Sequence, residues 1–220
     1  GIQGETGPQG ERGPAGQVTG SCGDDVKAAW EECDDGNTAD DDGCSSQCKA
    51  ELKKVAAGGY HACVLRGDGR IFCWGRNSWG QLGDGGTANS RNYSSRVRGI
   101  TTAVDVAANY HHSCAALANG TAKCWGHNGQ GQIGDGTTTQ RTEPTTVSGL
   151  TGATQIDTGY YHSCARLSNG TVKCWGYNNR GQLGDNSTSR RLTPVSVANL
   201  TGVAEVGCGQ ELSCALKADG

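Results

Sequence analysis

Twelve cysteines are the residues of this 220-residue chain whose type and spacing have the clearest chemical meaning. Six of them form three pairs, and the members of each pair stand ten positions apart: Cys63 and Cys73, Cys114 and Cys124, Cys164 and Cys174. Zinc sites use closely spaced CxxC-type clusters, which these pairs lack, so we expect disulfides. Because disulfides persist in oxidising compartments, the cysteines predict an extracellular or cell-surface location.

A second group of four cysteines brackets an acidic stretch. Cys22, Cys33, Cys44 and Cys48 allow three pairings, and the sequence does not choose among them. The stretch between Cys33 and Cys44 offers oxygen ligands of the kind that Ca²⁺ takes from short loops, although the spacing departs from the EF-hand. The candidate ligands are Asp34, Asp35, Asn37, Asp40 and Asp42. Either these side chains bind calcium, or they form a solvated loop held by disulfides and turns.

Candidate catalytic groups do not assemble into a recognisable set. The sequence has no nucleophile–base–acid arrangement and no dinucleotide-binding fingerprint. The Gly-Gln-Leu-Gly-Asp turns at residues 80–84 and 181–185 lack the Lys-Ser/Thr that follows in a phosphate loop. We therefore expect a protein that is not an enzyme and that uses no cofactor other than calcium.

Glycine spacing predicts the structure of the N-terminal segment, residues 1–17. Gly recurs at every third position from 1 to 16, and only Gly fits at the axis of a three-chain polyproline-II superhelix. We interpret the segment as a collagen-like stalk through which three chains form a homotrimer; a flexible glycine-rich linker is the alternative. Residues 18–50 follow as a cysteine-rich module, which is too small to fold without its disulfides.

From residue 51 onward the chain repeats itself with a period near 50 residues. The repeats occupy residues 51–100, 101–150 and 151–200, with a partial fourth at 201–220. Each complete repeat carries Cys-Trp-Gly, then an Asn, then Gly-Gln-Leu/Ile-Gly-Asp. A period of this length with one Trp and several Gly per unit indicates a propeller or a solenoid.

An Asn-Gly or Asp-Gly pair within each repeat predicts a β-hairpin. In the second repeat, a three-residue turn at 118–120 closes on Leu117 and Thr121. Counting back from that pair sets Cys114 opposite Cys124 in a non-hydrogen-bonded pair, with Cα atoms about 4.5 Å apart. This distance suits a disulfide, and the other two repeats have the same register.

Two further cysteines and two aligned residue types complete the repeat pattern. By the hairpin register, the partner of Cys214 would stand at position 224, and Cys208 is an extra thiol. Within residues 1–220 we therefore expect Cys214 either to be unpaired or to bond to Cys208. The tryptophans Trp74, Trp125 and Trp175 are expected to pack between blades. The histidines His61, His112 and His162 suggest a ring of metal ligands, but the spacing between blades would hold them apart, so we expect structural hydrogen bonds.

At these positions the repeats resemble a known family. H-x-C-x-x-L, a glycine turn and C-W-G-x-N-x-x-G-Q-L-G, as at residues 162–167 and 174–184, are similar to the regulator of chromosome condensation repeat. The resemblance implies an all-β fold in which residues 51–220 form about three and a half of seven blades of a β-propeller. The paired cysteines depart from the nuclear members and fit the exported bacterial members.

Residues 22–49 also resemble a known element. CGDD followed by EECDDGNTADDDGCSSQC is similar to the cysteine-rich repeat of myxobacterial surface proteins, which in turn looks like the Notch-type repeats of pappalysin metalloproteases. Asp41 departs from the pattern, because the family usually shows a neutral residue there. Notch-type repeats hold calcium, so the resemblance supports the calcium interpretation.

Composition excludes several classes of protein. Only 34% of the residues are hydrophobic and 37 are Gly, which suits short strands and turns. The net charge of −3 gives no electrostatic case for binding nucleic acid. We find no apolar run that would insert in a membrane and no signal peptide. Because Gly1 and Gly220 each interrupt a pattern, we expect the sequence to be a fragment of a longer exported protein.

Positions that differ between otherwise similar repeats are the candidate binding residues, because exposed loops carry recognition in repeat scaffolds. They are Arg76, Trp79, His127, Gln130, Tyr177 and Arg180, with the stretches 86–96, 137–146 and 187–195. We expect a structural, adhesive or protein-binding scaffold whose partner is an unidentified protein or glycan. Two alternatives stand beside it: nucleotide exchange on a small GTPase, as in nuclear relatives, and inhibition of an enzyme, as in a secreted β-lactamase inhibitor with this propeller.

Overall fold

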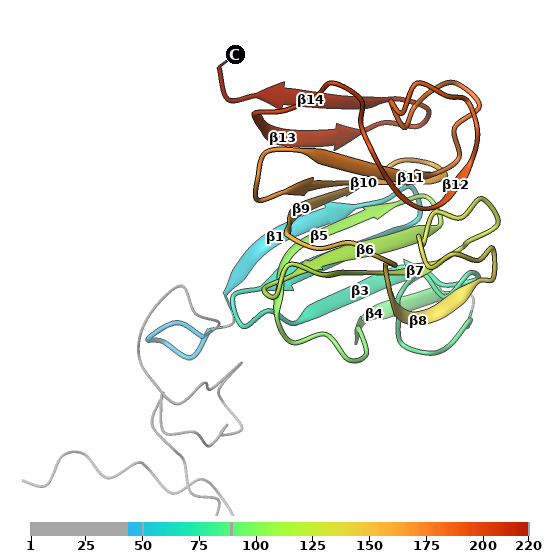
Figure 1. The fold of residues 1–220 in the computed structure, drawn as a ribbon. Coiled ribbons are helices and arrows are strands. Elements are labelled where there is room, and N and C mark those ends of the chain that lie inside the picture. Colours follow the sequence, from blue (N-terminus) through green and yellow to red (C-terminus); the bar gives the residue numbers. More distant parts are fainter. Residues whose placement is uncertain (1–43, 50, 89, 220) are drawn as a thin grey trace, which may run out of the picture. The chain divides into compact units, whose positions relative to one another are not determined.

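The computed structural model describes residues 44–49, 51–88 and 90–219, and every long element in those ranges is a β-strand (Figure 1). The strands are β1 (Leu52–Ala57), β2 (His61–Arg66), β3 (Ile71–Arg76), β4 (Ser90–Arg96), β5 (Ala103–Asn109), β6 (His112–Leu117), β7 (Ala122–Gly126), β8 (Arg141–Thr146), β9 (Ala153–Thr158), β10 (His162–Leu167), β11 (Val172–Gly176), β12 (Arg191–Ser196), β13 (Val203–Cys208) and β14 (Ser213–Lys217). The described ranges hold no helix long and apolar enough to cross a membrane.

The chain divides into two compact units, residues 1–52 with 66–68 and residues 53–65 with 69–220. In the first unit Cys44 and Cys48 are buried and both are disulfide-bonded. The N–H of Cys48 donates to the carbonyl of Ser45 at 2.8 Å. The remaining predictions for this unit lie outside the described residues: the collagen-like segment, Cys22, Cys33, and the calcium ligands Asp34, Asp35, Asn37, Asp40 and Asp42.

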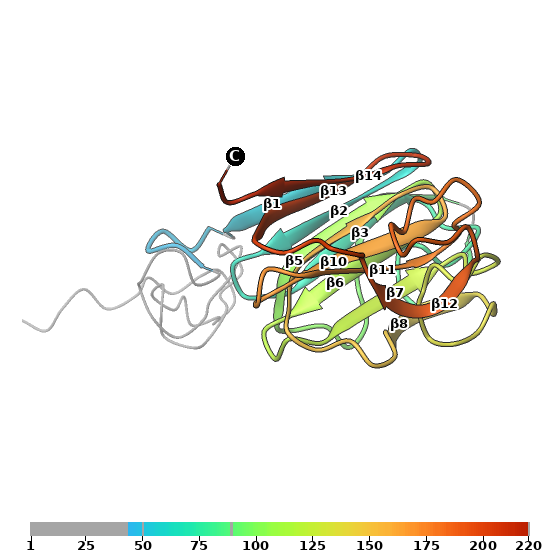
Figure 2. The same ribbon diagram turned by 45° about the horizontal axis from the view of Figure 1, so that its top comes forward.

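Each repeat of the second unit forms one antiparallel sheet. Three sheets have four strands in chain order, β1 to β4, β5 to β8 and β9 to β12, and β13 pairs with β14 in a two-stranded sheet. The sheets follow one another in Figure 1 from cyan to red, and Figure 2 shows the red β13–β14 hairpin from a second direction. Four-stranded sheets repeated in this way are propeller blades, so the predicted fold class of three blades and a half is confirmed.

The hairpin between the second and third strands of each blade has the predicted register. In the second blade the Leu117 N–H donates to the Thr121 carbonyl at 2.9 Å, and Gly120 ends the turn at φ 78°. Cys114 therefore lies opposite Cys124, with their Cα atoms 4.1 Å apart and their sulfurs bonded. The Cys63–Cys73 and Cys164–Cys174 disulfides form in the same way, so all three predicted bonds are confirmed.

The fourth strand of each blade corrects one sequence interpretation. The stretches 86–96, 137–146 and 187–195 were expected to be loops, but β4, β8 and β12 occupy much of them. These strands pair on one side only, so they tolerate variable and polar residues. Pro144 and Pro194 fit there because an outer strand does not need every N–H.

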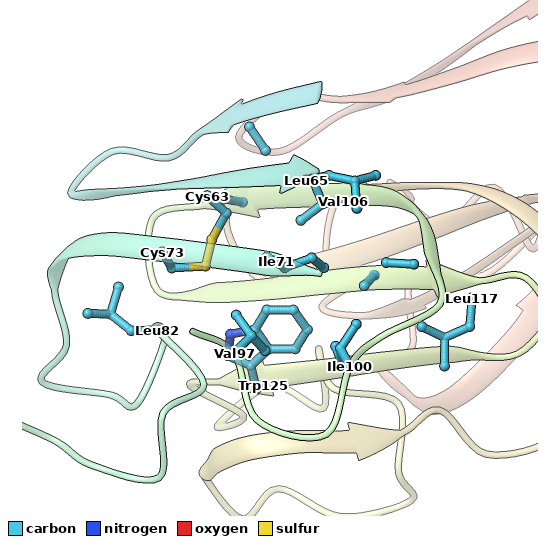
Figure 3. Close-up of a cluster of buried hydrophobic side chains, with 14 residues drawn as sticks. Cys63, Leu65, Ile71, Cys73, Leu82, Val97, Ile100, Val106, Leu117 and Trp125 are labelled. Carbon is cyan, nitrogen blue, oxygen red and sulfur yellow. A yellow bond between two sulfur atoms is a disulfide. The ribbon is translucent and has the colours of Figure 1, made fainter. Parts of the chain in front are cut away.

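Neighbouring blades are joined by one buried tryptophan each. The Trp125 side chain extends from β7 into the core of the first blade, where Figure 3 shows its ring among Ile71, Val97 and Ile100. It lies directly over Gly83, where an added Cβ would come within 2.8 Å of the indole nitrogen. Trp175 is fully buried in the same way, over Gly134 of the second blade.

Side chains of the first sheet are more exposed than those of the sheet that follows it. Every residue of β6 is buried, because that strand has a blade on each side. Trp74 is 38% exposed and Val55 is 61% exposed, since the described residues place no blade before the first. Packing between blades was therefore predicted correctly for Trp125 and Trp175 but not for Trp74.

Candidate functional site

The aligned histidines form hydrogen bonds between blades. His61 Nε2 lies 2.7 Å from Ser113 Oγ, and His112 Nε2 lies 2.9 Å from Ser163 Oγ. Ser113 donates its only proton to the Gln81 carbonyl, so it accepts from His61, which is neutral with its proton on Nε2. Burial lowers the pKa of His61 to about 4, with a smaller contribution from His111. These side chains are structural, as expected.

One group in the described part of the chain has the spacing of metal ligands. His162, Cys164 and Cys208 bring their ligand atoms within 4.8 Å of one another. However, Cys164 is bonded to Cys174 and cannot act as a thiolate. Cys208 is a free thiol, and burial, followed by the charge of Asp157, raises its pKa. A protonated thiol and a disulfide sulfur are poor ligands, so we do not interpret this group as a metal site.

The candidate binding residues stand on loops that the repeat scaffold fixes. A buried asparagine begins each loop, and Asn77 Oδ1 accepts from the Leu82 N–H at 3.0 Å while its Nδ2 donates to Asp84 at 3.1 Å. The side chain of Gln81 then accepts from the Trp79 N–H at 2.9 Å. The side chains of Gln132 and Gln182 accept in the same way from the N–H groups of Gln130 and Arg180. The loop backbone is thus held by the same hydrogen bonds in each repeat, while the exposed side chains differ.

The other three candidates are hydrogen-bonded to a neighbouring loop. The N–H groups of Arg76, His127 and Tyr177 donate to the carbonyls of Tyr60, His111 and Tyr161, at 2.9, 2.8 and 2.9 Å. The acceptors lie in the turn between the first and second strands of the same blade. Each blade therefore presents side chains from two adjacent turns on one face.

Rings on these turns form a continuous band across the blades. We call it the aromatic face, and it consists of Tyr60, Trp79, Tyr110, His111, His127, Tyr160, Tyr161 and Tyr177. Ring centroids lie 4.6 Å apart for Trp79 and His127, and 4.3 Å apart for both Tyr110 with Tyr160 and Tyr160 with Tyr161. Rings held this close lose little conformational entropy on binding, which is typical of recognition surfaces.

The aromatic face has neutral rings in its middle and arginines at its ends. Burial, followed by the charge of Arg76, lowers the pKa of His111, and burial followed by the charge of His111 lowers the pKa of His127. Both imidazoles are therefore uncharged at neutral pH. Arg76 lies over the Tyr60 ring at 5.2 Å, and Arg180 lies 3.9 Å from Glu211 in an exposed ion pair.

A depression opens in this face where the third blade meets the β13–β14 sheet. It has a volume of about 260 Å³, and its lining residues are Gln130, Tyr160, Tyr161, Tyr177, Gln210 and Glu211. Gln210 Nε2 donates to the Tyr110 hydroxyl at 2.9 Å, which fixes the amide at the rim. Burial, with contributions from Tyr160, raises the pKa of Tyr161, so its hydroxyl stays protonated. The depression thus combines aromatic walls with neutral hydrogen-bonding groups.

The structure brings together all six binding residues chosen from the sequence, and their role stays a prediction. Sequence reasoning missed the five rings on the other turn: Tyr60, Tyr110, His111, Tyr160 and Tyr161. A signal was present, because the two positions before each aligned histidine also vary between repeats and are rich in aromatic residues. Only the fold shows that these two variable turns lie side by side.

Sequence comparison identifies the repeats. The profile of the regulator of chromosome condensation (RCC1) repeat matches residues 68–116, 119–166 and 169–216. A second profile of the same repeat matches residues 52–81, 103–132 and 153–182. Residues 18–49 match a domain of unknown function, DUF4215.

Similar curated proteins share only the repeats. The probable E3 ubiquitin-protein ligase HERC3 of Homo sapiens is 42% identical over 86 residues, which are 38% of this chain and 8% of that protein. The Protein RCC2 homolog of Danio rerio is 34% identical over 96 residues, 43% of this chain and 19% of that protein. The chain thus spans a small part of either relative.

Solved structures agree on the fold. Human WBSCR16 superposes with a TM-score of 0.68 at 22% identity, covering 76% of this chain and 44% of that one. Prp20p from Saccharomyces cerevisiae, described with its binding to Gsp1p and histones, gives a TM-score of 0.67 at 22% identity, covering 77% of this chain and 45% of that one. At this identity the likeness concerns the fold alone.

Proposed function

The chain belongs to the regulator of chromosome condensation repeat family, and from this premise we propose that it is a non-enzymatic binding scaffold that uses its aromatic face. In this proposal the protein acts outside the cell or at the cell surface, where the collagen-like segment is a trimeric stalk and the propeller repeats hold the ligand. The ligand is a protein or a glycan. The residues of the face carry recognition, and the histidines and cysteines support them.

The observation that carries the proposal is the position of the variable residues. Arg76, Trp79, His127, Gln130, Tyr177 and Arg180 differ between repeats, yet all lie on one face beside five further rings. Packing of a buried core gives no reason for residues on one face to differ between repeats while the remaining motif positions agree. Aromatic and arginine side chains are also the types that dominate binding energy in protein interfaces.

Three disulfides in the blades support the proposed location. Each bonds a cysteine pair that a reducing compartment would keep as thiols. The acidic stretch of residues 34–42 is proposed to hold calcium and so to stabilise the cysteine-rich module next to the stalk. Calcium of this kind is structural.

The proposal is tested by attachment of the full-length protein, fluorescently labelled, to intact cells and cell envelopes of the species that makes it. We expect saturable attachment that is lost when Trp79, Tyr161 and Tyr177 are all changed to Ala. Tyr93→Ala is the matched control, because Tyr93 is a 57% exposed tyrosine on β4 that is not among the residues of the aromatic face. Equal attachment of all three proteins would contradict a binding role for the aromatic face.

A second candidate function, nucleotide exchange on a small GTPase, follows from the family and not from this site. Prp20p is described as binding Gsp1p, but at 22% identity this likeness transfers no partner. An exported chain would not meet a GTPase in the cytosol. Release of labelled GDP from a small GTPase in the presence of the full chain would be the result that favours this alternative.

A further inference from the structure

We propose that the depression between the third blade and the β13–β14 sheet binds one neutral pyranose ring of a glycan. This inference rests on the proposed function, because it assigns a ligand class to one part of the aromatic face. The depression is lined by Gln130, Tyr160, Tyr161, Tyr177, Gln210 and Glu211, and its volume of about 260 Å³ is below the roughly 300–1,000 Å³ of sites for drug-sized ligands. It therefore fits a single ring with the remainder of the ligand outside.

The walls suit the C–H faces of a sugar. The Tyr160 and Tyr161 rings meet at 75° with centroids 4.3 Å apart, and Tyr177 lies edge-on to Tyr161 at 6.2 Å. Rings at these angles expose both a face and an edge to the space between them. The face of an aromatic ring carries partial negative charge, so it attracts the weakly positive C–H groups of a pyranose.

The polar groups of the lining suit sugar hydroxyls. A hydroxyl both donates and accepts, and a side-chain amide offers one acceptor and two donors at the same point. Gln130 and Gln210 provide such amides at two sides of the depression, and Glu211 provides a carboxylate that only accepts. Part of their capacity is already used, since Gln210 donates to Tyr110, Gln130 accepts from Arg190 and Glu211 pairs with Arg180. A purely apolar guest would leave the remaining donors and acceptors of these groups without partners, which opposes its binding.

The charges of the rim disfavour the main competing ligand, a lysine or arginine side chain. Tyrosine rings beside a carboxylate can hold a cation, but Arg180 already lies 3.9 Å from Glu211. A guanidinium nitrogen of Arg190 lies 3.3 Å from the Gly129 carbonyl and 3.5 Å from the Gln130 side chain. Two positive groups at the rim repel an incoming cation, whereas a neutral ring meets no such opposition.

The test uses the full-length protein with methyl glycosides of glucose, galactose and mannose as probes, and saturation-transfer difference NMR as the measurement. We expect saturation at the ring C–H protons of at least one glycoside. The dissociation constant should rise about tenfold or more in Tyr161→Ala and in Tyr177→Ala and stay unchanged in Tyr93→Ala, since one buried aromatic contact contributes on that scale. Gln210→Ala is a second probe: it removes an exposed amide and that amide's hydrogen bond to the Tyr110 hydroxyl, and it should weaken glycoside binding without loss of folding.

Two results would overturn the inference. One is binding of Nα-acetyl-arginine methyl ester to the depression with no saturation of any glycoside, which would assign a cationic protein side chain instead. The other is glycoside binding that neither tyrosine substitution weakens. If cell attachment still depends on the aromatic face in either case, the sugar assignment fails and the proposed scaffold function stands. If attachment is also independent of the face, both fail.

Discussion

The indole nitrogen of Trp125 donates a hydrogen bond of 2.8 Å to the backbone carbonyl of Gln81 in the preceding blade. Ser113 donates to the same carbonyl at 2.9 Å. The side chain of Gln81 also accepts a hydrogen bond from the Trp79 N–H. One residue therefore links the interface between blades to the candidate binding loop. The packing between blades and the conformation of the Trp79 loop are therefore coupled at Gln81.

This coupling predicts unequal effects of two tryptophan substitutions. Trp125→Ala removes a fully buried ring, and we expect it to reduce the free energy of unfolding by about 3–5 kcal/mol. Trp74→Ala, at the aligned position, removes a ring that is 38% exposed and should cost about 1 kcal/mol or less. Urea unfolding followed by circular dichroism measures both. Similar losses for the two variants would show that the interface between blades is not where stability resides.

Acidification should destabilise the propeller in a defined window. Burial lowers the pKa of His61 and His162 to about 4 and holds that of His112 well below its usual value. Below about pH 6.5 the unfolded chain takes up protons that the folded chain refuses, so stability falls with pH by up to about 1.4 kcal/mol per unit and site. Above about pH 7 all three are neutral in both states, and the profile should be flat.

Asp185 titrates in a different pH range from the buried histidines, so the two contributions to stability can be separated. Burial alone would raise the pKa of Asp185, but hydrogen bonds from Ser187, Arg191 and Asn178 lower it to about 2. The stability that ionised Asp185 gives the folded state is fully present above its ordinary pKa of about 3.9. It is lost only as pH falls below that value. Burial raises the pKa of Asp157, so that carboxyl can only add stability as pH falls. A loss of thermal stability between pH 8 and 4.5 therefore reports the histidines. A profile that His112→Gln leaves as steep as before would refute the assignment.

The two free cysteines among the residues that the structure describes should differ in reactivity. Cys214 is exposed, whereas Cys208 is half-buried and its pKa is raised, so Cys208 presents almost no thiolate at neutral pH. Iodoacetamide applied to the native protein of residues 1–220 should modify Cys214 first, and peptide mass spectrometry identifies the site. Cys214→Ser is the control that should abolish the fast reaction. Fast modification at Cys208 would contradict the burial of that thiol.

Calcium binding by the acidic stretch stays a prediction with its own test. Isothermal titration of the full chain should show one calcium site that is weakened at least tenfold when Asp34 and Asp42 are changed to Asn, because each loses a charged oxygen ligand. Asp219→Asn is the control, since Asp219 is an exposed carboxylate outside the stretch. No calcium heat at millimolar concentration would favour the solvated loop.

The sequence predicted the blades because their determinants are local and repeated. The Asn119-Gly120 turn and the ten-residue cysteine spacing together fix the register of β6 and β7, and the same pattern recurs in each repeat. The exposure of Trp74 could not be predicted in this way. An aligned position implies the same environment only where a blade lies on both sides.

The aromatic face was predicted in part. Tyr177 and Arg180 were found because they vary between repeats within a fixed motif. The neighbouring Tyr160 and Tyr161 lie in a different turn, and the hydrogen bond from the Tyr177 N–H to the Tyr161 carbonyl depends on strand pairing across the blade. The depression also needs Gln210 from the next sheet, and that proximity is a property of blade stacking.

The central claim is that the aromatic face binds the ligand, and tyrosine footprinting tests it most directly. Five of the six tyrosines of the chain lie on this face, and Tyr93 lies outside it. The full-length protein is nitrated free and while attached to cell envelopes of its own species, and each site is quantified by mass spectrometry. We predict protection of Tyr60, Tyr110, Tyr160, Tyr161 and Tyr177 with unchanged nitration of Tyr93. Protection of Tyr93 alone, or equal nitration of all six in both states, would contradict the account.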